Sequence, residues 1–135
     1  MELKITRGMS IIHQKEITSA DTGAVYGSGA LEFLLSTPAI VGMVIEASMK
    51  LLDPLVPEGY VTVGSKVETA HLTPTLLGES VHIILTVLAV EGNRIDLEFA
   101  VHDHVGLIAK GKHERFVVAS DQLLQMAYSR LGKEV

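Results

Sequence analysis

The most constraining feature of this sequence is an apolar run of helical length near its middle. Residues 39–56 read AIVGMVIEASMKLLDPLV and contain few polar side chains. Thr37 is a favourable N-cap and Pro38 suits the first helical position, so together they predict where the helix begins. Asp53-Pro54 predicts where it ends. A helix that is apolar on nearly all sides is expected to be buried, so the rest of the chain has to wrap around it.

The residues after this helix alternate in polarity and predict strands. We expect four of them, over residues 60–72, 79–90, 94–102 and 107–118. A fifth strand is predicted before the helix, over Leu3 to His13, with Gly8 as a bulge or break. A long helix followed by a run of strands favours an α+β fold, with a five-stranded antiparallel sheet around the central helix.

Two further segments flank this predicted core. Residues 19–33, SADTGAVYGSGALEF, are rich in glycine and small polar residues, and predict a loop or broken helix that lies over another part of the molecule as a lid would. Near the C-terminus, Ser120 predicts the cap of a short helix, with Gly132 just beyond its end. The apolar residues of that helix recur at helical spacing: Leu123, Leu124, Ala127 and Leu131.

Composition excludes several classes of protein. A chain of 135 residues with 47% apolar residues is expected to form one domain, residues 1–135. The absence of cysteine excludes disulfides and thiolate catalysis, and fits a cytoplasmic location. A net charge of -5 with scattered cations argues against nucleic-acid binding. The sequence has no signal peptide and no apolar run of membrane-spanning length, so no membrane partner is expected.

Three stretches of the chain resemble a known family. They are SADT…YGSG…STPA, VGSKVETAHLTPTLLGESV and HDHVGLIAKGKHERFVV, and HLTPTLLG with GKHER at this distance downstream is the most specific. Over nearly its whole length the chain resembles the hotdog-fold thioesterases of the fluoroacetyl-CoA thioesterase-like family. The resemblance implies a hotdog fold, an acyl-CoA substrate, no cofactor, and a homodimer with its active site at the subunit interface.

The resemblance also assigns candidate site residues. Thr37 and His71 match the family's catalytic threonine and histidine, which come from different subunits, and Gly64 matches a glycine that approaches the thioester. The family's glutamate stands eight residues after the threonine, where this chain has Ile45, and Glu46 follows one place later. One residue rotates a side chain by about 100° around a helix, so Glu46 can at most assist. We therefore expect either an acyl-CoA thioesterase that uses an activated water, or a protein that binds an acyl-CoA without hydrolysing it.

Each of these residues also has a purely structural interpretation. Thr37 before a proline can serve only as a helix cap, and His71 can be an ordinary hydrogen-bonded strand residue. In the catalytic interpretation, His71 is the base, and backbone N–H groups at the start of the helix stabilise the developing oxyanion. Glu46 pairs naturally with Lys50 one helical turn later, and the residues alone favour this ion pair.

The last predicted strand adds one more candidate for binding the substrate. Alternation places His113 and Arg115 on one face of this strand and Lys110 and Lys112 on the other. Arg115 or the two lysines could contact phosphates of coenzyme A, although lysines on strands commonly serve as simple edge charges. No metal site is expected, because the remaining candidate ligands have none of the usual spacings. These are His102, Asp103 and His104, together with His113.

Overall fold

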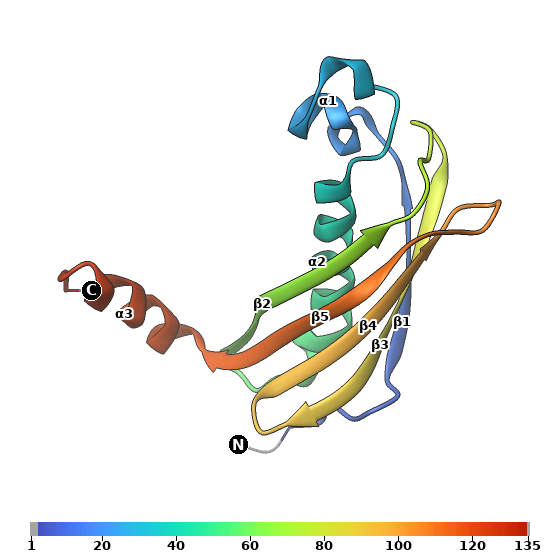
Figure 1. The fold of residues 1–135 in the computed structure, drawn as a ribbon. Helices are drawn as coiled ribbons and strands as arrows, with labels where there is room; N and C mark the ends of the chain where they lie inside the picture. The colour runs from blue at the N-terminus through green and yellow to red at the C-terminus, as the bar shows by residue number, and fades with distance from the viewer. Residues whose placement is uncertain (1–2, 135) are drawn as a thin grey trace.

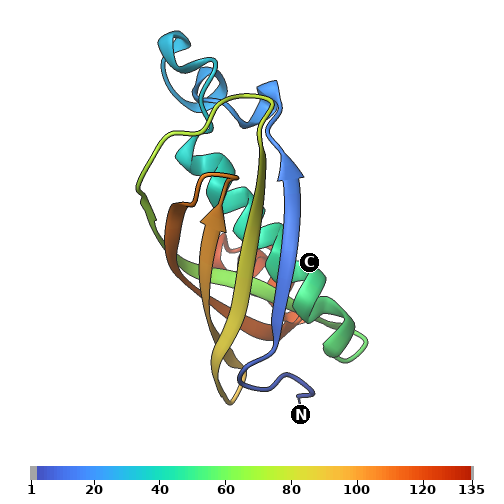
Figure 2. The same ribbon diagram turned by 90° about the vertical axis from the view of Figure 1, so that its right-hand side faces the viewer.

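The computed structural model describes residues 3–134 and shows a long helix lying across a curved sheet (Figures 1 and 2). The helices and strands, in chain order, are β1 (Ser10–Glu16), α1 (Gly23–Tyr26), α2 (Thr37–Leu52), β2 (Tyr60–His71), β3 (Ser80–Glu91), β4 (Arg94–His102), β5 (Leu107–Ala119) and α3 (Ser120–Arg130). The strands form one antiparallel sheet in the order β1-β3-β4-β5-β2. The predicted α+β arrangement is thus confirmed.

Helix α2 begins one residue away from the predicted position of its cap. Ser36 is the N-cap, and its hydroxyl accepts a hydrogen bond from the N–H of Ala39 at 3.2 Å. The prediction that Thr37 caps the helix is therefore wrong, since Thr37 is the first helical residue and Pro38 the second. Proline is tolerated in the first turn because the N–H groups there have no intrahelical partner. This shift of one residue leaves the Thr37 hydroxyl free to bond elsewhere.

The core lies between α2 and the inner face of the sheet. Strands β3 and β4 alternate buried and half-buried positions, as a sheet covered on one face requires. The buried side chains of α2 pack against theirs: Ile40, Met43, Val44, Ala47 and Leu52 against Val81, Ile83, Leu85, Val87, Ile95, Leu97, Phe99 and Val101. Each large apolar side chain buried here contributes roughly 1.5–3 kcal/mol. The prediction that the helix is buried on nearly all sides is therefore correct for one face only, because Gly42, Ile45 and Met49 lie on a face that is exposed.

The two edges of the sheet differ in length. β1 is seven residues long and begins at Ser10 rather than at Leu3, because Gly8 turns the chain with a φ of 93° and donates its N–H to the carbonyl of Val87. The predicted strand over residues 3–13 is thus displaced towards the C-terminus. β2, at the other edge, is twelve residues long, and its outer side has no partner strand among residues 3–134.

Of the two forms predicted for the glycine-rich segment, a loop or a broken helix, the structure shows the broken helix. Residues 19–31 form two 3-10 turns, Ser19–Asp21 and Gly29–Leu31, on either side of α1, and the whole segment sits over the N-terminal end of α2 (Figure 1). A third 3-10 turn, Asp53–Leu55, follows α2. No helix between residues 3 and 134 is long and apolar enough to span a membrane.

Helix α3 extends from the end of β5 and projects away from the rest of the domain (Figure 1). Its N-cap is Ala119 rather than the predicted Ser120, whose hydroxyl instead donates to the carbonyl of Gly59 at 3.2 Å. Gly132 has a φ of 70°, as predicted for the glycine that follows a helix. None of the residues of α3 is buried.

Candidate active site

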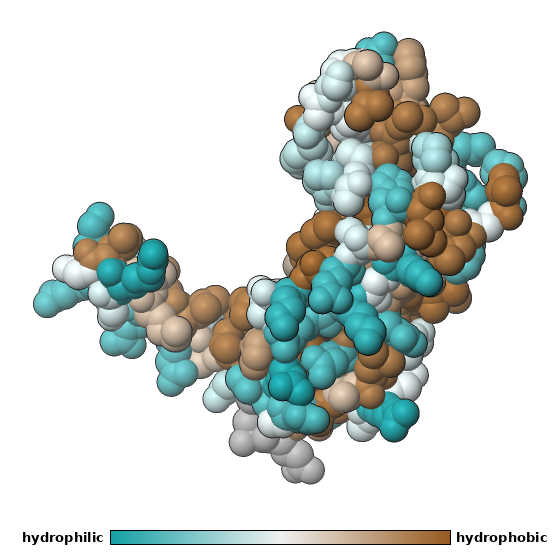
Figure 3. All heavy atoms as spheres, in the orientation of Figure 1, coloured by the Kyte–Doolittle hydropathy of each residue, from teal (hydrophilic) through white to brown (hydrophobic). Residues whose placement is uncertain are grey.

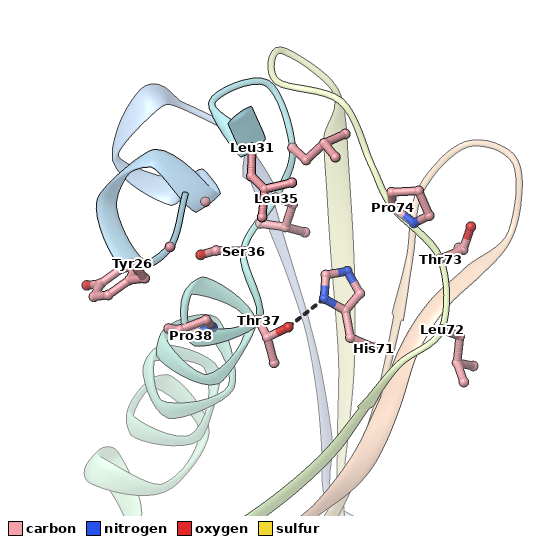
Figure 4. Close-up of a pocket in the computed structure, with 13 residues that line it drawn as sticks. Tyr26, Leu31, Leu35, Ser36, Thr37, Pro38, His71, Leu72, Thr73 and Pro74 are labelled. Atoms are coloured by element: carbon pink, nitrogen blue, oxygen red, sulfur yellow. Dashed lines mark hydrogen bonds between the residues drawn. The ribbon is translucent and has the colours of Figure 1, made fainter. Parts of the chain in front are cut away.

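The hydroxyl of Thr37 and the imidazole of His71 point towards one another at the N-terminal end of α2 (Figure 4). Thr37 Oγ1 lies 2.8 Å from His71 Nδ1. Thr37 is the first residue of α2 and His71 is the last residue of β2, and both belong to the same chain. We expected this threonine and histidine to meet across a subunit boundary, but they contact each other within one chain, so that expectation is wrong.

Backbone hydrogen bonds hold the pair in place. His71 pairs with Ala109 of β5, and the N–H of Leu72 donates to the carbonyl of Ile108 at 2.7 Å, which continues the ladder one residue past the strand. The loop that follows is tied to the segment before α2, because the N–H of Leu35 donates to the carbonyl of Thr75 at 2.9 Å. Thr37 and His71 therefore lie on a helix and a strand that are connected by backbone hydrogen bonds between their adjoining loops, which favours a fixed geometry.

Burial is the main influence on the imidazole of His71. It lowers the pKa of His71 below the ordinary value of 6.5, while the nearby backbone of Thr73 acts in the opposite direction. At neutral pH the ring is therefore neutral, and one of its nitrogens can accept a proton. The other nitrogen, Nε2, is buried without a hydrogen-bond partner among residues 3–134. This pair thus has unused hydrogen-bonding capacity, which is uncommon for buried polar groups.

A cavity of about 350 Å³ opens beside the pair (Figure 4). Its walls are Gly23, Tyr26, Gly27, Leu31, Leu34, Leu35, Ser36, Thr37, Pro38, His71, Leu72, Thr73 and Pro74. The lining contains no lysine, arginine or carboxylate, so the space suits an uncharged group. Its volume is at the lower end of the range for ligand pockets, which extends from roughly 300 to 1,000 Å³.

The start of α2 offers fewer backbone donors than predicted. Pro38 has no N–H, and the N–H groups of Ala39 and Ile40 donate to the hydroxyl and the carbonyl of Ser36. The backbone N–H of Thr37 makes no such hydrogen bond to Ser36, so it remains available to a substrate. The positive end of the helix dipole still lies at this position and favours negative charge there.

Glu46 does not join this site. It follows Thr37 by nine residues, which places it roughly 180° around the helix axis. Its carboxylate lies 3.7 Å from Lys50 Nζ, which confirms the predicted ion pair, and 3.6 Å from His13 Nε2. The structure thus gives no support to an assisting catalytic role for Glu46. Ile45, at the position of the family's acid, is 37% exposed and supplies no carboxylate.

Gly64 lies far from the cavity within one chain. Seven residues separate it from His71 along β2, a span of roughly 23 Å. A Cβ atom at Gly64 would stand 3.0 Å from Cε1 of His113 and 3.4 Å from Nη1 of Arg115. Within the chain, the glycine makes room for these two side chains, and the contact of Gly64 with a thioester stays a prediction.

Arg115 is buried, with 3% of its surface exposed. Its guanidinium donates to the hydroxyl of Thr62 at 3.1 Å, to the Thr62 carbonyl at 2.7 Å, and to Nε2 of His113 at 3.1 Å. Burial lowers its pKa, and the charge of Asp53 acts in the opposite direction. The alternation of β5 is as predicted, with Arg115 and His113 inside and Lys110 and Lys112 outside. A guanidinium so enclosed is not placed to bind coenzyme A phosphates.

Sequence reasoning missed Ser36 and most of the cavity wall. The signal for Ser36 was present, because Ser36-Thr37-Pro38 offers two good capping residues in succession. The hydroxyl of Ser36 caps the helix, and the hydroxyl of Thr37 is therefore free to bond His71. For the cavity wall, a broken glycine-rich segment carries no periodicity from which its inward-facing residues could be identified.

Comparisons with known proteins identify relatives of this chain. A family model described as fluoroacetyl-CoA-specific thioesterase matches residues 17–121. A fluoroacetyl-CoA thioesterase from Streptantibioticus cattleyicolor is 28% identical over 85 residues, which cover 63% of this chain and 61% of that protein. The chain thus aligns with about three fifths of the curated relative's length.

Solved structures show the same fold. A hot-dog-like protein from Thermanaerovibrio acidaminovorans superposes with a TM-score of 0.87 at 35% identity, covering 92% of this chain and 91% of that one. A structure of the fluoroacetyl-CoA thioesterase FlK superposes with a TM-score of 0.83 at 24% identity, covering 91% and 95%. The predicted hotdog fold is thereby confirmed.

Proposed function

Because the chain belongs to the fluoroacetyl-CoA-specific thioesterase family, we propose that it is an acyl-CoA thioesterase in which Thr37 and His71 hydrolyse a small or medium acyl thioester with an activated water. The observation that carries this proposal is the 2.8 Å hydrogen bond between the two side chains, at the wall of an apolar cavity. A neutral imidazole bonded to a hydroxyl is the arrangement that general-base catalysis requires.

In the proposed reaction, water adds to the thioester carbonyl and coenzyme A leaves as a thiol. His71 Nδ1 accepts the Thr37 hydroxyl proton, while Thr37 Oγ1 takes a proton from the attacking water. The water oxygen bonds to the carbonyl carbon, and the oxyanion develops near the N–H of Thr37 and the positive end of α2. Collapse of the intermediate breaks the carbon–sulfur bond, and the proton held by His71 passes to the departing sulfur.

The lining of the cavity favours a substrate whose acyl group is uncharged. Its lining is mainly leucine, proline and glycine, and without a lysine or arginine it has no partner for a carboxylate at the far end of the acyl chain. Its volume of about 350 Å³ fits a short or medium chain better than a long one. Coenzyme A itself, with its charged phosphates, would lie outside the cavity.

The proposal includes a homodimer formed through β2, in the cytoplasm. A twelve-residue edge strand with unpaired N–H and C=O groups is a template for pairing with another chain. Closed two-fold symmetry is the commonest arrangement of such pairs, and it makes the two β2 strands antiparallel. His71 ends this strand, so the active site would lie beside the subunit interface.

One observation favours a second candidate function, the binding of an acyl-CoA without hydrolysis. Ile45 stands where the family carries an acid, and no carboxylate lines the cavity in the described part of the chain. Tight binding of a non-hydrolysable analogue together with no thiol release would select this function. Appearance of hydrolysis in Ile45→Glu would support it further.

The proposed activity is tested by thiol release from a panel of acyl-CoA thioesters. We expect turnover with short or medium uncharged acyl groups, and a decrease of roughly 10²–10⁴-fold in kcat for Thr37→Val, which removes the hydroxyl but keeps the shape. Thr37→Ser, which keeps the hydroxyl, should retain most of the activity. No turnover of any thioester by the unmodified chain would contradict the proposal.

A further inference from the structure

Helix α3 carries an apolar stripe that nothing in the described chain covers. Leu123, Leu124 and Ala127 fall on one face by helical spacing, and Leu131 continues this face just past the end of the helix. Leu124 and Leu131 are 51% and 64% exposed. Figure 3 shows apolar side chains at the surface of the projecting helix. Isolated helices shorter than about 12–15 residues are marginal in water, so this eleven-residue helix needs a packing partner.

A second uncovered apolar surface surrounds the mouth of the cavity. Three lining residues, Tyr26, Leu31 and Leu72, are 63%, 44% and 53% exposed, and we call them the pocket rim. Apolar side chains also gather in Figure 3 at the end of the molecule where this rim lies. Exposed apolar clusters of this kind mark sites of association with a ligand or another chain.

The two surfaces lie at opposite ends of β2 and cannot meet within one chain. α3 begins beside Tyr60, which pairs with Ala119, and the N–H of Ser120 donates to the carbonyl of Gly59 at 3.0 Å. The pocket rim adjoins His71, which lies roughly 36 Å from Tyr60 along the strand. In Figure 1, α3 extends beyond the β2 edge of the sheet, away from its own cavity.

Two-fold pairing of β2 brings these surfaces together. When two copies of a twelve-residue strand pair antiparallel with full overlap, Tyr60 stands opposite the partner subunit's His71. α3 starts at Ser120, next to Tyr60, and would therefore start beside the partner's pocket rim. If the two β2 strands pair with a register shifted by a few residues, the distance between the start of α3 and the partner's pocket rim changes by less than the length of α3, which is about 16 Å.

We propose that the apolar stripe of α3 docks against the pocket rim of a second copy of this chain, so that each acyl-binding site is completed by the C-terminal helix of the partner. This inference rests on the homodimer in the proposed function. The second copy is the occupant that the structure favours, because the free β2 edge, α3 and the pocket rim then form one continuous surface. The helix would shield the acyl group and its thioester from solvent.

Chemical crosslinking tests this docking without relying on catalysis. The sequence contains no cysteine, so two introduced cysteines are the only thiols. In Leu72→Cys/Leu124→Cys, a short bifunctional maleimide should join two chains into a covalent dimer. Gln122 lies on the other face of α3, and the matched control Leu72→Cys/Gln122→Cys should give far less dimer. Each single cysteine variant measures the background from like-with-like crosslinks.

Two results would overturn the docking of α3. One is a monomer in sedimentation of the unmodified chain, and the other is equal crosslinking through positions 122 and 124. Neither measurement requires substrate, so a chain that dimerises and crosslinks as expected but does not hydrolyse thioesters would retain this inference while the proposed activity failed.

A kinetic readout completes the test if turnover is found. Leu124→Glu places a charge against the partner's pocket rim and should raise KM for the acyl-CoA by about tenfold, the effect of removing one well-buried apolar contact. Gln122→Glu adds the same charge on the outer face and should leave KM within about twofold. Equal KM values for the two variants would contradict the docking.

Discussion

Two histidines of the same sheet, His71 and His113, show how imidazoles whose pKa values shift in the same direction can differ in chemistry. Burial lowers the pKa of both imidazoles. His113 is 2% exposed, its Nδ1 donates to the carbonyl of Lys66 at 2.7 Å, and its Nε2 accepts from Arg115 at 3.1 Å. Both of its nitrogens are therefore used, and its neutral tautomer is fixed.

His71 has one nitrogen on the hydroxyl of Thr37, the other without a partner in the described chain, and an open cavity beside it. The comparison teaches that residue type and pKa direction do not distinguish a reactive histidine from a structural one. The distinguishing feature is a ring nitrogen without a hydrogen-bond partner together with an adjacent cavity. The two networks should therefore respond in opposite ways to substitution.

The largest effect we expect is the loss of activity in His71→Ala. Removal of a general base typically lowers kcat by roughly 10²–10⁴-fold, whereas the free energy of unfolding should change little because half of the ring's hydrogen-bonding capacity is unused in the folded chain. His113→Ala should show the reverse, with lower stability but activity retained per folded molecule. Thiol release and urea unfolding on both variants measure this, and equal effects of the two substitutions would contradict the comparison.

The pH dependence of activity and of stability separates the two histidines. The active form has a neutral His71, and burial places its pKa below 6.5, so kcat/KM should be level at neutral pH and fall by about tenfold per pH unit below that pKa. His113 also has a lowered pKa, hence the unfolded chain binds its proton first. Its contribution to stability is present above pH 6.5 and is lost as the pH falls from there through the folded pKa. In His113→Ala, this part of the stability profile should flatten while the activity profile keeps its shape.

Arg115→Ala should cause the next largest loss, in stability alone. The substitution removes three hydrogen bonds and leaves Nε2 of His113 and the carbonyl oxygen of Thr62 without the partner that Arg115 supplies, although the Thr62 hydroxyl keeps its bond to Asp53. Together with the cavity left behind, we expect a decrease of about 3 kcal/mol in the free energy of unfolding. Urea unfolding measures it, with Lys112→Ala on the exposed face of β5 as the control. If Arg115→Ala left the stability unchanged and raised KM, Arg115 would instead be a substrate-binding residue.

Gly64→Ala perturbs the same cluster by a single carbon. The new Cβ would stand 3.0 Å from His113 Cε1, so the ring must move and strain its two hydrogen bonds. We expect a loss of about 1–2 kcal/mol in stability, as for other overpacked sites. Gly29→Ala is a matched control, because a Cβ there meets no atom within 4 Å. A specific loss of kcat/KM in Gly64→Ala with normal stability would show that the glycine serves the thioester after all.

Local patterns in the sequence were sufficient to predict the architecture. The limits of α2, the four later strands and the tail helix follow from period and punctuation, which act over a few residues. The first strand was displaced because Gly8 adopts a left-handed turn, whereas the alternation around it would fit a strand on either side.

The site was predicted only in part, since its interactions join residues distant in sequence. Thr37 and His71 were identified through the resemblance, but whether they meet within a chain depends on where β2 ends relative to α2, and sequence pattern does not specify this. Arg115 was expected at a phosphate because arginine is common there, yet the register of β5 on β2 directs it at Thr62. The pairing of Glu46 with Lys50 was predicted from helical spacing alone, and this ion pair is confirmed.

The smallest effect we expect concerns Ser36, the residue that makes the Thr37–His71 pair possible. Ser36→Ala removes the cap that accepts the N–H of Ala39, which typically costs about 1 kcal/mol. The hydroxyl of Thr37 is then the nearest substitute cap, and if it turned to the helix it would leave His71. Activity per folded molecule should therefore fall together with stability in Ser36→Ala, while Ser36→Asp, which restores a cap, should recover both. A loss of stability with full activity would show that Thr37 is held at His71 by the imidazole alone, and that the choice of cap does not position the pair.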